Sequence, residues 1–227
     1  SEAVLRLGLA LADGSIAHDT ALEVELFPVA PALPPRNAVI VGAGDGKAAQ
    51  LARDLGLQIA DAAETYLVDD FTRFTERRRD IEDAARRGAI VVFLELPAGE
   101  CEIADSTIKV VSCGKDALHF VSRDTGHLLA ADFQPEDFRL WFDPLVDRIS
   151  PILATTFTAE GWTPILTSGS ALAAAESRFG HGVIRICQVQ LSGRTTHNPV
   201  AALFARRLVS TSVADDRGLG RTRPGTQ

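Results

Sequence analysis

The sequence predicts an α/β protein in which helices cover an open, mostly parallel β-sheet in three layers, with an antiparallel edge. Short, continuously apolar runs at 38–41 and 89–96 alternate with helical segments. Such runs are typical of strands that are buried on both faces of a parallel sheet. Later in the chain, two apolar runs flank a Gly-His-Gly turn at 180–182. This pattern predicts an antiparallel hairpin, which we expect at the edge of the sheet.

The first 27 residues are predicted to form a β-hairpin. Residues 3–10 and 21–27 alternate in part between apolar and polar side chains, and Asp13-Gly14 between them favours a turn. A lone hairpin buries too little apolar surface to be stable in water. We therefore expect the remnant of a preceding β-sandwich. Because the chain also contains no methionine, we interpret it as a C-terminal fragment; a complete chain shortened by a protease is the alternative.

The rest of the chain divides into three parts. Residues 28–36 include four prolines, which predict a semi-rigid linker. Residues 37–209 are expected to form the α/β domain, and residues 210–227, which lack apolar periodicity, a flexible tail. Within the domain the patterns predict strands at 38–41, 66–68, 89–96, 108–111, 119–121, 163–166, 171–179 and 183–190, helices at 47–55, 76–87 and 199–208, and an irregular aromatic segment at 133–157.

The composition is that of an ordinary globular protein and argues against several functions. The net charge is −7, and no basic stripe carries interleaved aromatic residues, so we expect no nucleic-acid partner. No apolar run approaches the roughly 20 residues that span a bilayer, so we expect no membrane partner and favour a cytoplasmic location. Cys101, Cys113 and Cys187 lack disulfide or metal-ligand spacing and are expected to be reduced, in or near the core.

A glycine-rich segment, Gly42-x-Gly44-x-Gly46, follows the first strand of the domain and precedes a helix. A dinucleotide site would need a third glycine where Lys47 stands, because the helix must pack closely on the strand there. An acidic residue lies about twenty positions on, at Asp69 or Asp70. Since acidic residues are common, we interpret the glycines as a flexible strand-to-helix turn and assign no cofactor.

No catalytic, cofactor-binding or metal-ligating residue is assigned. A nucleophile elbow would place Ser or Cys directly after the strongest strand, but the turn there, at 96–98, reads Leu-Pro-Ala. A thiol enzyme would have to use Cys101 or Cys113 with His119 or His127 as the base. The remaining histidines also lack metal-ligand spacing; they are His18, His181 and His197.

Several segments resemble class I glutamine-amidotransferase-like domains, which have a flavodoxin-type fold. More narrowly, they are similar to the C-terminal domain of some family 2 glycoside hydrolases and to the related trimerisation domain of certain β-galactosidases. The segments lie at 84–94, 138–144, 161–166, 178–191, 193–194 and 198–201. The amidotransferase Cys is absent from the turn at 96–98, and neither His181 nor His197 begins the expected His-x-Glu pair. No amidotransferase residue is therefore carried over.

The resemblance implies a non-catalytic accessory or oligomerisation domain of a β-galactosidase-like glycoside hydrolase that acts on carbohydrate. The parent protein would be the glycosidase, and the fragment would be inactive alone. Its partners would be the remainder of the parent polypeptide and further copies in a homo-oligomer, which would meet the 171–190 hairpin or the aromatic segment around Trp141. The alternatives are a free-standing amidase or hydrolase of the same fold, and a carbohydrate-binding module that stacks sugars on Trp141 and Trp162. For these tryptophans we favour core packing, because aromatic residues make up only 6% of the chain.

Overall fold

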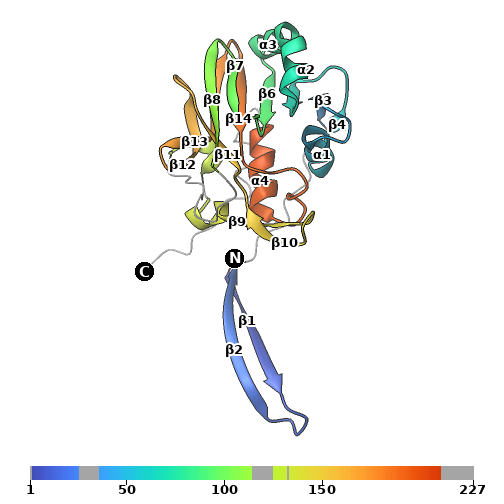
Figure 1. The fold of residues 1–227 in the computed structure, drawn as a ribbon. Coiled ribbons are helices and arrows are strands. Elements are labelled where there is room, and N and C mark those ends of the chain that lie inside the picture. The colour runs from blue at the N-terminus through green and yellow to red at the C-terminus, as the bar shows by residue number, and fades with distance from the viewer. Residues whose placement is uncertain (1, 26–35, 114–124, 132, 211–227) are drawn as a thin grey trace, which may run out of the picture.

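The computed structural model describes residues 2–25, 36–113, 125–131 and 133–210. Strands β1 (Glu2–Ala10) and β2 (Ile16–Glu25) pair with each other in an antiparallel, two-stranded sheet that extends away from the other elements (Figure 1). We call this sheet the arm and the remaining described residues the body. The predicted N-terminal hairpin is therefore present, while residues 26–35, which hold most of the expected linker, lie outside the described residues.

One half of the body's sheet is parallel. Four apolar strands and a short edge strand pair side by side, as the continuous apolar runs predict. In spatial order they are β4 (Gln58–Ile59), β3 (Asn37–Val41), β5 (Thr65–Val68), β6 (Ile90–Leu94) and β14 (Gly182–Cys187).

The other half of the sheet is antiparallel. From β14 the order continues through β13 (Ala171–Phe179), β11 (Thr155–Thr158), β8 (Ser106–Ser112) and β7 (Gly99–Ile103), and β12 (Thr163–Ser168) also pairs with β13. Five of the nine pairings are antiparallel. The prediction of a mostly parallel sheet was thus wrong, because local periodicity does not reveal which distant strands pair.

The hairpin of β13 and β14 lies in the middle of the sheet and not at its edge. On the side away from β13, β14 pairs with β6. On the side away from β14, β13 pairs with β11 and β12. The apolar run at 173–175 is completely buried. The expected edge position is therefore wrong: this apolar run fills the core, and other strands pair with the hairpin on both of its sides.

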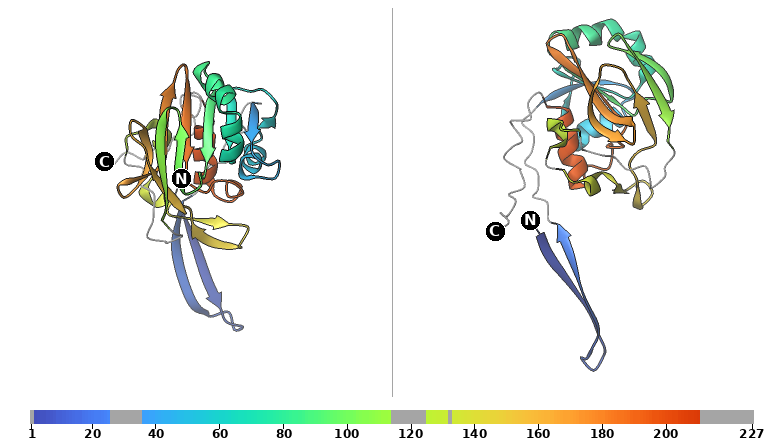
Figure 2. Two further views of the ribbon diagram at one scale, coloured as in Figure 1. Left: turned by 45° about the horizontal axis from the view of Figure 1, so that its top comes forward. Right: turned by 90° about the vertical axis from the view of Figure 1, so that its left-hand side faces the viewer.

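Short helices cover both faces of the parallel half. On one face, α1 (Lys47–Asp54) and α4 (Pro199–Leu208) pack on a core that includes Leu67 and Val92. On the other face, α2 (Phe71–Glu76) and α3 (Arg78–Arg86) pack over Val91 and Phe93. The sheet curls (Figure 2), and with its large antiparallel half the flavodoxin-type three-layer arrangement is not confirmed.

The charged helix predicted at 76–87 is present as α3, and α2, which was not predicted, directly precedes it. They meet at Arg77, which ends one helix and begins the next. One face of α3 is buried, since Ile81 and Ala85 pack on the sheet and Glu82 is buried beside Arg78.

The aromatic segment predicted to be irregular contains short regular elements. They are the 3₁₀ helix η2 (Pro135–Phe138) and the hairpin strands β9 (Leu140–Asp143) and β10 (Arg148–Pro151), followed by β11. A second 3₁₀ helix, η1 (Leu128–Ala130), precedes the segment. Phe133 and Phe138 make edge-to-face contacts with each other and with Phe204 of α4. These rings attach the segment to the core beneath the sheet.

Helix α4 begins where the sequence predicts, but Asn198 does not cap it with its side chain. Instead the Asn198 amide accepts from the backbone N–H of Phe142 and donates to its carbonyl oxygen, at 3.0 and 2.9 Å. Asn198 therefore joins β9 to the start of α4. The strand expected at 119–121 and the tail from residue 211 lie outside the described residues.

Candidate functional site

The carboxyl ends of β3, β5, β6 and β14 meet at one edge of the parallel half, where open α/β sheets commonly bind ligands. The glycine-rich turn at 42–46 follows β3, Asp69 follows β5, Glu95 follows β6 and Gln188 follows β14. We call this group the sheet-end site.

The glycine-rich turn encloses the carboxylate of Asp69. A Cβ atom on Gly42 would lie 1.6 Å from Asp69 Oδ1, and one on Gly46 would lie 2.4 Å from Oδ2. The same Oδ2 accepts a hydrogen bond of 2.8 Å from the backbone N–H of Ala48 in the first turn of α1. The glycines thus leave room for a side chain of the protein, and that carboxylate occupies the position where a dinucleotide fold would hold a phosphate.

Glu95 has a left-handed backbone, with φ of 51°, directly after the central strand β6. Its carboxylate lies 2.7 Å from the ammonium group of Lys47, and its backbone N–H donates to the carbonyl of Cys187. This conformation is uncommon for a residue with a side chain. The turn at which the amidotransferase resemblance would expect a nucleophile therefore begins with an acidic residue held by a lysine.

Gln188 fixes the next residue of this turn. Its side-chain oxygen accepts from the Leu96 N–H at 2.7 Å, and its amide nitrogen donates to the Leu96 carbonyl and to Thr155 Oγ1. Gln188 is almost fully buried, so these bonds satisfy an amide that would otherwise be costly to bury. The hydrogen bonds from Gln188 to Leu96 therefore hold the backbone of this turn in its observed conformation.

The cysteines lie in environments that oppose nucleophilic chemistry. Cys101 on β7 and Cys187 on β14 are buried, Cys113 after β8 is partly buried, and all three are free thiols, as expected. Burial raises the pKa of Cys101 and of Cys113, and raises the pKa of Cys187 to about 12. A thiol nucleophile needs the opposite shift. Of the candidate bases, His119 lies outside the described residues.

His127 belongs to a charged network that the sequence did not predict. Its Nδ1 accepts from the Leu129 N–H, which leaves the proton on Nε2, 3.1 Å from Glu176 Oε1. The other oxygen of Glu176 lies 2.9 Å from Nε of the buried Arg185. Burial alone would raise the pKa of Glu176, but the His127 hydrogen bond and the Arg185 charge lower it to about 2.

Arg185 extends this network to the end of helix α4. Its guanidinium donates to the carbonyl oxygens of Arg207, Leu208 and Ser210. A cation is favourable at the carboxyl end of a helix, where the last carbonyl groups point out of the helix; the Arg207 carbonyl also accepts from the Ser210 N–H. Because the three partners come from residues 127, 176 and 185, no local motif in the sequence marks the network. The described contacts of this network hold parts of the fold together, so we interpret its role as structural.

The two tryptophans are core residues, as the composition favoured. Trp141 on β9 is buried against Phe138 and donates through Nε1 to the Asp137 carbonyl, and Trp162 is buried in the core on the other face of the sheet. A sugar ring could not stack on either without displacing part of the core. The described structure therefore does not support a carbohydrate-binding platform at these residues.

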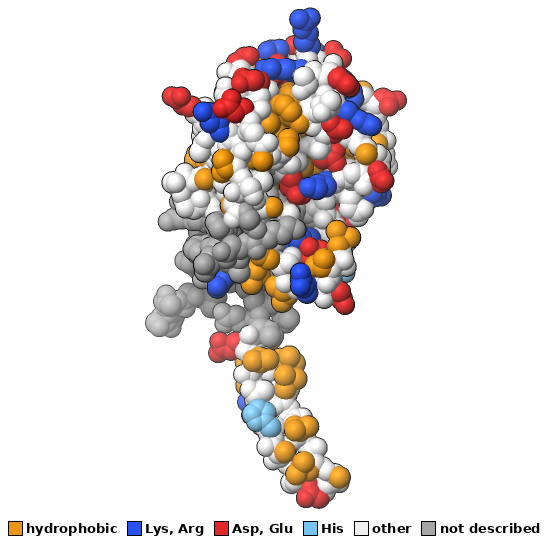
Figure 3. Space-filling view, in the orientation of Figure 1, with side chains coloured by type: hydrophobic (Ala, Val, Ile, Leu, Met, Phe, Trp, Pro, Cys, Tyr) orange, Lys and Arg blue, Asp and Glu red, His pale blue; other side chains and the backbone are white. Residues whose placement is uncertain are grey.

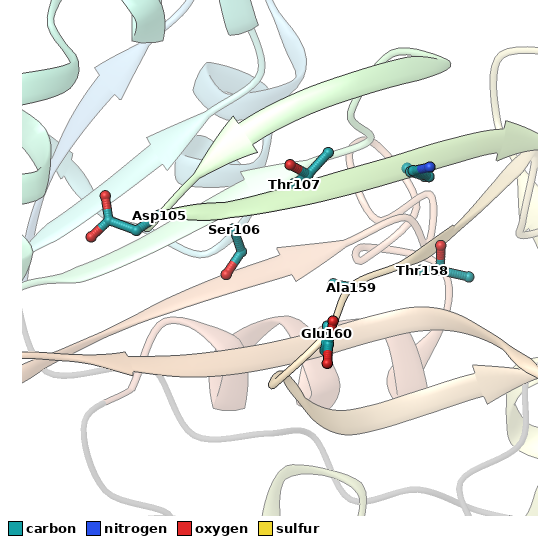
Figure 4. A pocket seen from close by; sticks show the side chains of 7 residues that line it. Asp105, Ser106, Thr107, Thr158, Ala159 and Glu160 are labelled. Atoms are coloured by element: carbon teal, nitrogen blue, oxygen red, sulfur yellow. The ribbon is translucent and has the colours of Figure 1, made fainter.

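An open groove of about 690 Å³ lies between the β7–β8 turn and the segment after β11 (Figure 4). Its lining combines hydroxyl, carboxylate and ammonium groups. Figure 4 shows that the Asp105 carboxylate points away from Glu160, so this pair does not converge on one point. The lining residues are Asp105, Ser106, Thr107, Lys109, Thr158, Ala159 and Glu160.

Within the described ranges, no three His, Cys, Asp or Glu side chains gather as a metal site requires. None of the helices in the same part of the chain is long and apolar enough to cross a membrane.

Comparison with known proteins gives similarity to solved structures only. No family model matches the chain, and no curated protein does. A cold-adapted β-galactosidase from Rahnella sp. R3 is 13% identical with a TM-score of 0.49, over 83% of this chain and 32% of that one. A β-galactosidase from Bacillus circulans sp. alkalophilus is 9% identical with a TM-score of 0.43, over 82% of this chain and 31% of that one. A cytoplasmic protein from Salmonella typhimurium is 8% identical with a TM-score of 0.41, over 90% of this chain and 94% of that one.

The chain spans only about a third of the length of the two β-galactosidases that it matches, 32% and 31%. The amidotransferase part of the resemblance is not confirmed by the comparisons.

Proposed function

We propose that this chain is the C-terminal part of a larger β-galactosidase-like glycoside hydrolase, and that its body is a non-catalytic accessory and oligomerisation domain. In this proposal residues 1–27 are the last hairpin of a preceding β-sandwich, residues 28–36 are a linker and residues 37–209 are the accessory domain. The observation that carries the proposal is the exposed apolar face of the arm.

The register of the arm separates two kinds of face. Leu5 pairs with Leu22, and Leu7 and Leu9 follow at two-residue intervals, so these four leucines lie on one face. All four are exposed, with Leu9 exposing 62% of its surface. The opposite face carries Val4 together with the charged residues Arg6, Asp19 and Glu23. Figure 3 shows hydrophobic side chains, in orange, along much of the length of the arm.

An apolar face of this kind is more stable when a second layer of protein covers it. Fully burying one leucine contributes about 1.5–3 kcal/mol, so completing the burial of four half-exposed leucines would contribute roughly 3–6 kcal/mol. Two-stranded sheets are marginally stable in water without such a layer. The charged face is suited to solvent, so the arm has the pattern of an outer hairpin in a sandwich, with its leucines facing the second sheet.

The class of the parent protein comes from the sequence resemblance. Its longest segment, 178–191, forms the end of β13, the turn and β14 in the middle of the sheet. The resemblance therefore bears on the core of the domain. A non-catalytic role is supported by the buried thiols with raised pKa values and by the use of Gln188, Asp69 and Glu95 in holding the sheet-end site.

The proposal is tested on the complete natural polypeptide. Its reading frame should encode a β-sandwich directly before the arm and a catalytic barrel further upstream. In that polypeptide, Leu5→Ser and Leu7→Ser should lower the thermal unfolding temperature, because the leucines would be buried there. Val4→Ser on the charged face is the matched control and should have little effect. A stop codon a few dozen codons before the arm, or equal effects of Leu5→Ser and Val4→Ser, would overturn the proposal.

A further inference from the structure

A second exposed apolar surface lies on the body, on the hairpin of β9 and β10. We propose that this surface binds the same surface of a second copy of the chain about a two-fold axis. We call it the β9–β10 face. It deepens the proposed function, on whose oligomerisation role it rests, by assigning the subunit contact to named residues.

The register of β9 and β10 gives this hairpin one inner and one outer face. Phe142 pairs with Ile149, and Leu140 pairs with Pro151, so these four apolar residues lie on the outer face. Ile149 exposes 66% of its surface, and Leu140 is also exposed. At the tip of the hairpin, Leu145 exposes 90% of its surface and Val146 is exposed too. Orange side chains are visible in this lower part of the body in Figure 3.

The inner face of the hairpin is fixed to the body. Trp141 is buried in the core, and the Asp143 carboxylate accepts from the buried Arg194 at 2.6 Å. Arg194 also donates to Ser150 Oγ on the partner strand. Asn198 bonds both backbone groups of Phe142. The outer face is therefore held in one conformation before any partner arrives, which lowers the entropic cost of binding.

The charged residues at the two ends of the β9–β10 face favour a second copy of the chain as its binding partner. Asp147 lies at the tip, and Arg139 directly precedes β9 at the base; both are exposed. When two copies stack face to face about a two-fold axis with their strands antiparallel, the tip of each lies over the base of the other. Asp147 then meets Arg139 of the second copy twice, and Leu145 meets the second copy's Leu140. The parallel arrangement would bring like charges together.

The size of the face predicts a weak contact. Its exposed apolar area is on the order of 400 Å², which is typical of the largest patch on a monomer. Two such faces bury less than the roughly 1,600 Å² of a standard interface. We therefore expect a dimer that dissociates on dilution in the chain as it stands.

Sedimentation velocity over a wide range of protein concentration tests the inference. The unchanged chain should show reversible dimers. Leu145→Asp should weaken the dimer at least about tenfold, because it places a charge in the apolar contact between the tip of one copy and Leu140 of the other. Ile59→Asp is the matched control, since Ile59 is an exposed apolar residue on β4 at the edge of the main sheet; it should leave the dimer unchanged. Urea unfolding of each variant checks that the body remains folded.

Charge exchange tests the two-fold arrangement. Arg139→Glu and Asp147→Lys should each weaken the dimer, and the double variant should restore it, because both new pairs again carry opposite charges. A strict monomer at every concentration, or a double variant no better than the single ones, would overturn the inference. So would a dimer that Leu5→Ser and Leu7→Ser abolish while Leu145→Asp leaves it intact, since the arm would then be the occupant. None of these outcomes alters the test on the complete polypeptide.

Discussion

The arm and the body are both built from strands with alternating or continuous apolar residues, yet they use them differently. In the body, Leu67 and Val92 are fully buried between helices and the sheet. In the arm, Leu7 and Leu9 point from a regular antiparallel ladder into solvent. The difference shows that turn and register suffice to define a hairpin, whereas burial requires a second layer. The body has its own second layer, whereas the leucines of the arm are exposed among the described residues.

Of the effects that distinguish the body from the arm, the largest should be the loss of stability when a buried charge is removed from the body. Arg185→Leu removes the guanidinium that bonds the Glu176 carboxylate, the carbonyls of Arg207 and Leu208 in α4, and the Ser210 carbonyl just after α4. Breaking a buried ion pair in this way costs about 3–5 kcal/mol. The free energy of unfolding, measured with urea and tryptophan fluorescence, should fall by this amount.

The matched control is Lys109→Leu, because Lys109 and Glu100 form an exposed pair at 3.5 Å. Exposed pairs contribute at most about 1 kcal/mol. Equal losses in Arg185→Leu and Lys109→Leu would show that the Glu176 network contributes no more than a surface ion pair.

A second, smaller effect is expected at the sheet-end site. Gly42→Ala places a Cβ atom on the Asp69 carboxylate, which must move and weaken its bond to the Ala48 N–H. Overpacking of this kind costs about 1–3 kcal/mol. Gly44→Ala should be nearly neutral, because no described atom lies within 4 Å of its Cβ position. If both alanine variants unfold at the same urea concentration, the turn does not enclose the carboxylate as described.

The pH dependence of stability should come partly from Glu176. Its pKa is lowered from 4.5 to about 2 in the folded protein. A carboxyl group with a lowered folded pKa contributes stability above its unfolded pKa, and this contribution is lost as the pH falls from about 4.5 to about 2. Urea unfolding between these values should show a steeper loss for the unchanged protein than for Glu176→Gln. Parallel pH profiles would contradict the assignment.

Local pattern explains how much of the fold was predictable. The apolar run at 89–96, the helix before Gly56 and the Gly-His-Gly turn all produced the expected elements, because each depends on residues close in sequence. The position of β14 beside β6 depends on pairing between residues about ninety positions apart, and the sequence contains no local sign of it. The prediction consequently placed a central hairpin at the edge.

The sheet-end site was predictable to a similar extent. Gly42 and Asp69 could be named as a glycine turn and a following acid, but their contact depends on β3 and β5 being neighbours. The contact between His127 and Glu176 joins residues 49 positions apart, through side chains that are only partly exposed. Buried polar networks of this kind follow from tertiary packing, so composition and spacing do not reveal them.

The smallest effect is expected at Leu7 in the arm. Comparing it with the same substitution at Leu67 in the body tests the difference between the two regions directly. Leu7→Ala in the arm and Leu67→Ala in the body remove the same atoms from a β-strand, but Leu7 exposes 47% of its surface and Leu67 none. The buried substitution should cost about 2–5 kcal/mol, because it leaves a cavity in the core. The arm substitution should change the unfolding free energy of the body by less than about 0.5 kcal/mol. Both are read from the same urea transition. A loss for Leu7→Ala that approaches the loss for Leu67→Ala would mean that the arm packs on its own body in solution, and the proposal that its leucines face a preceding domain would fail.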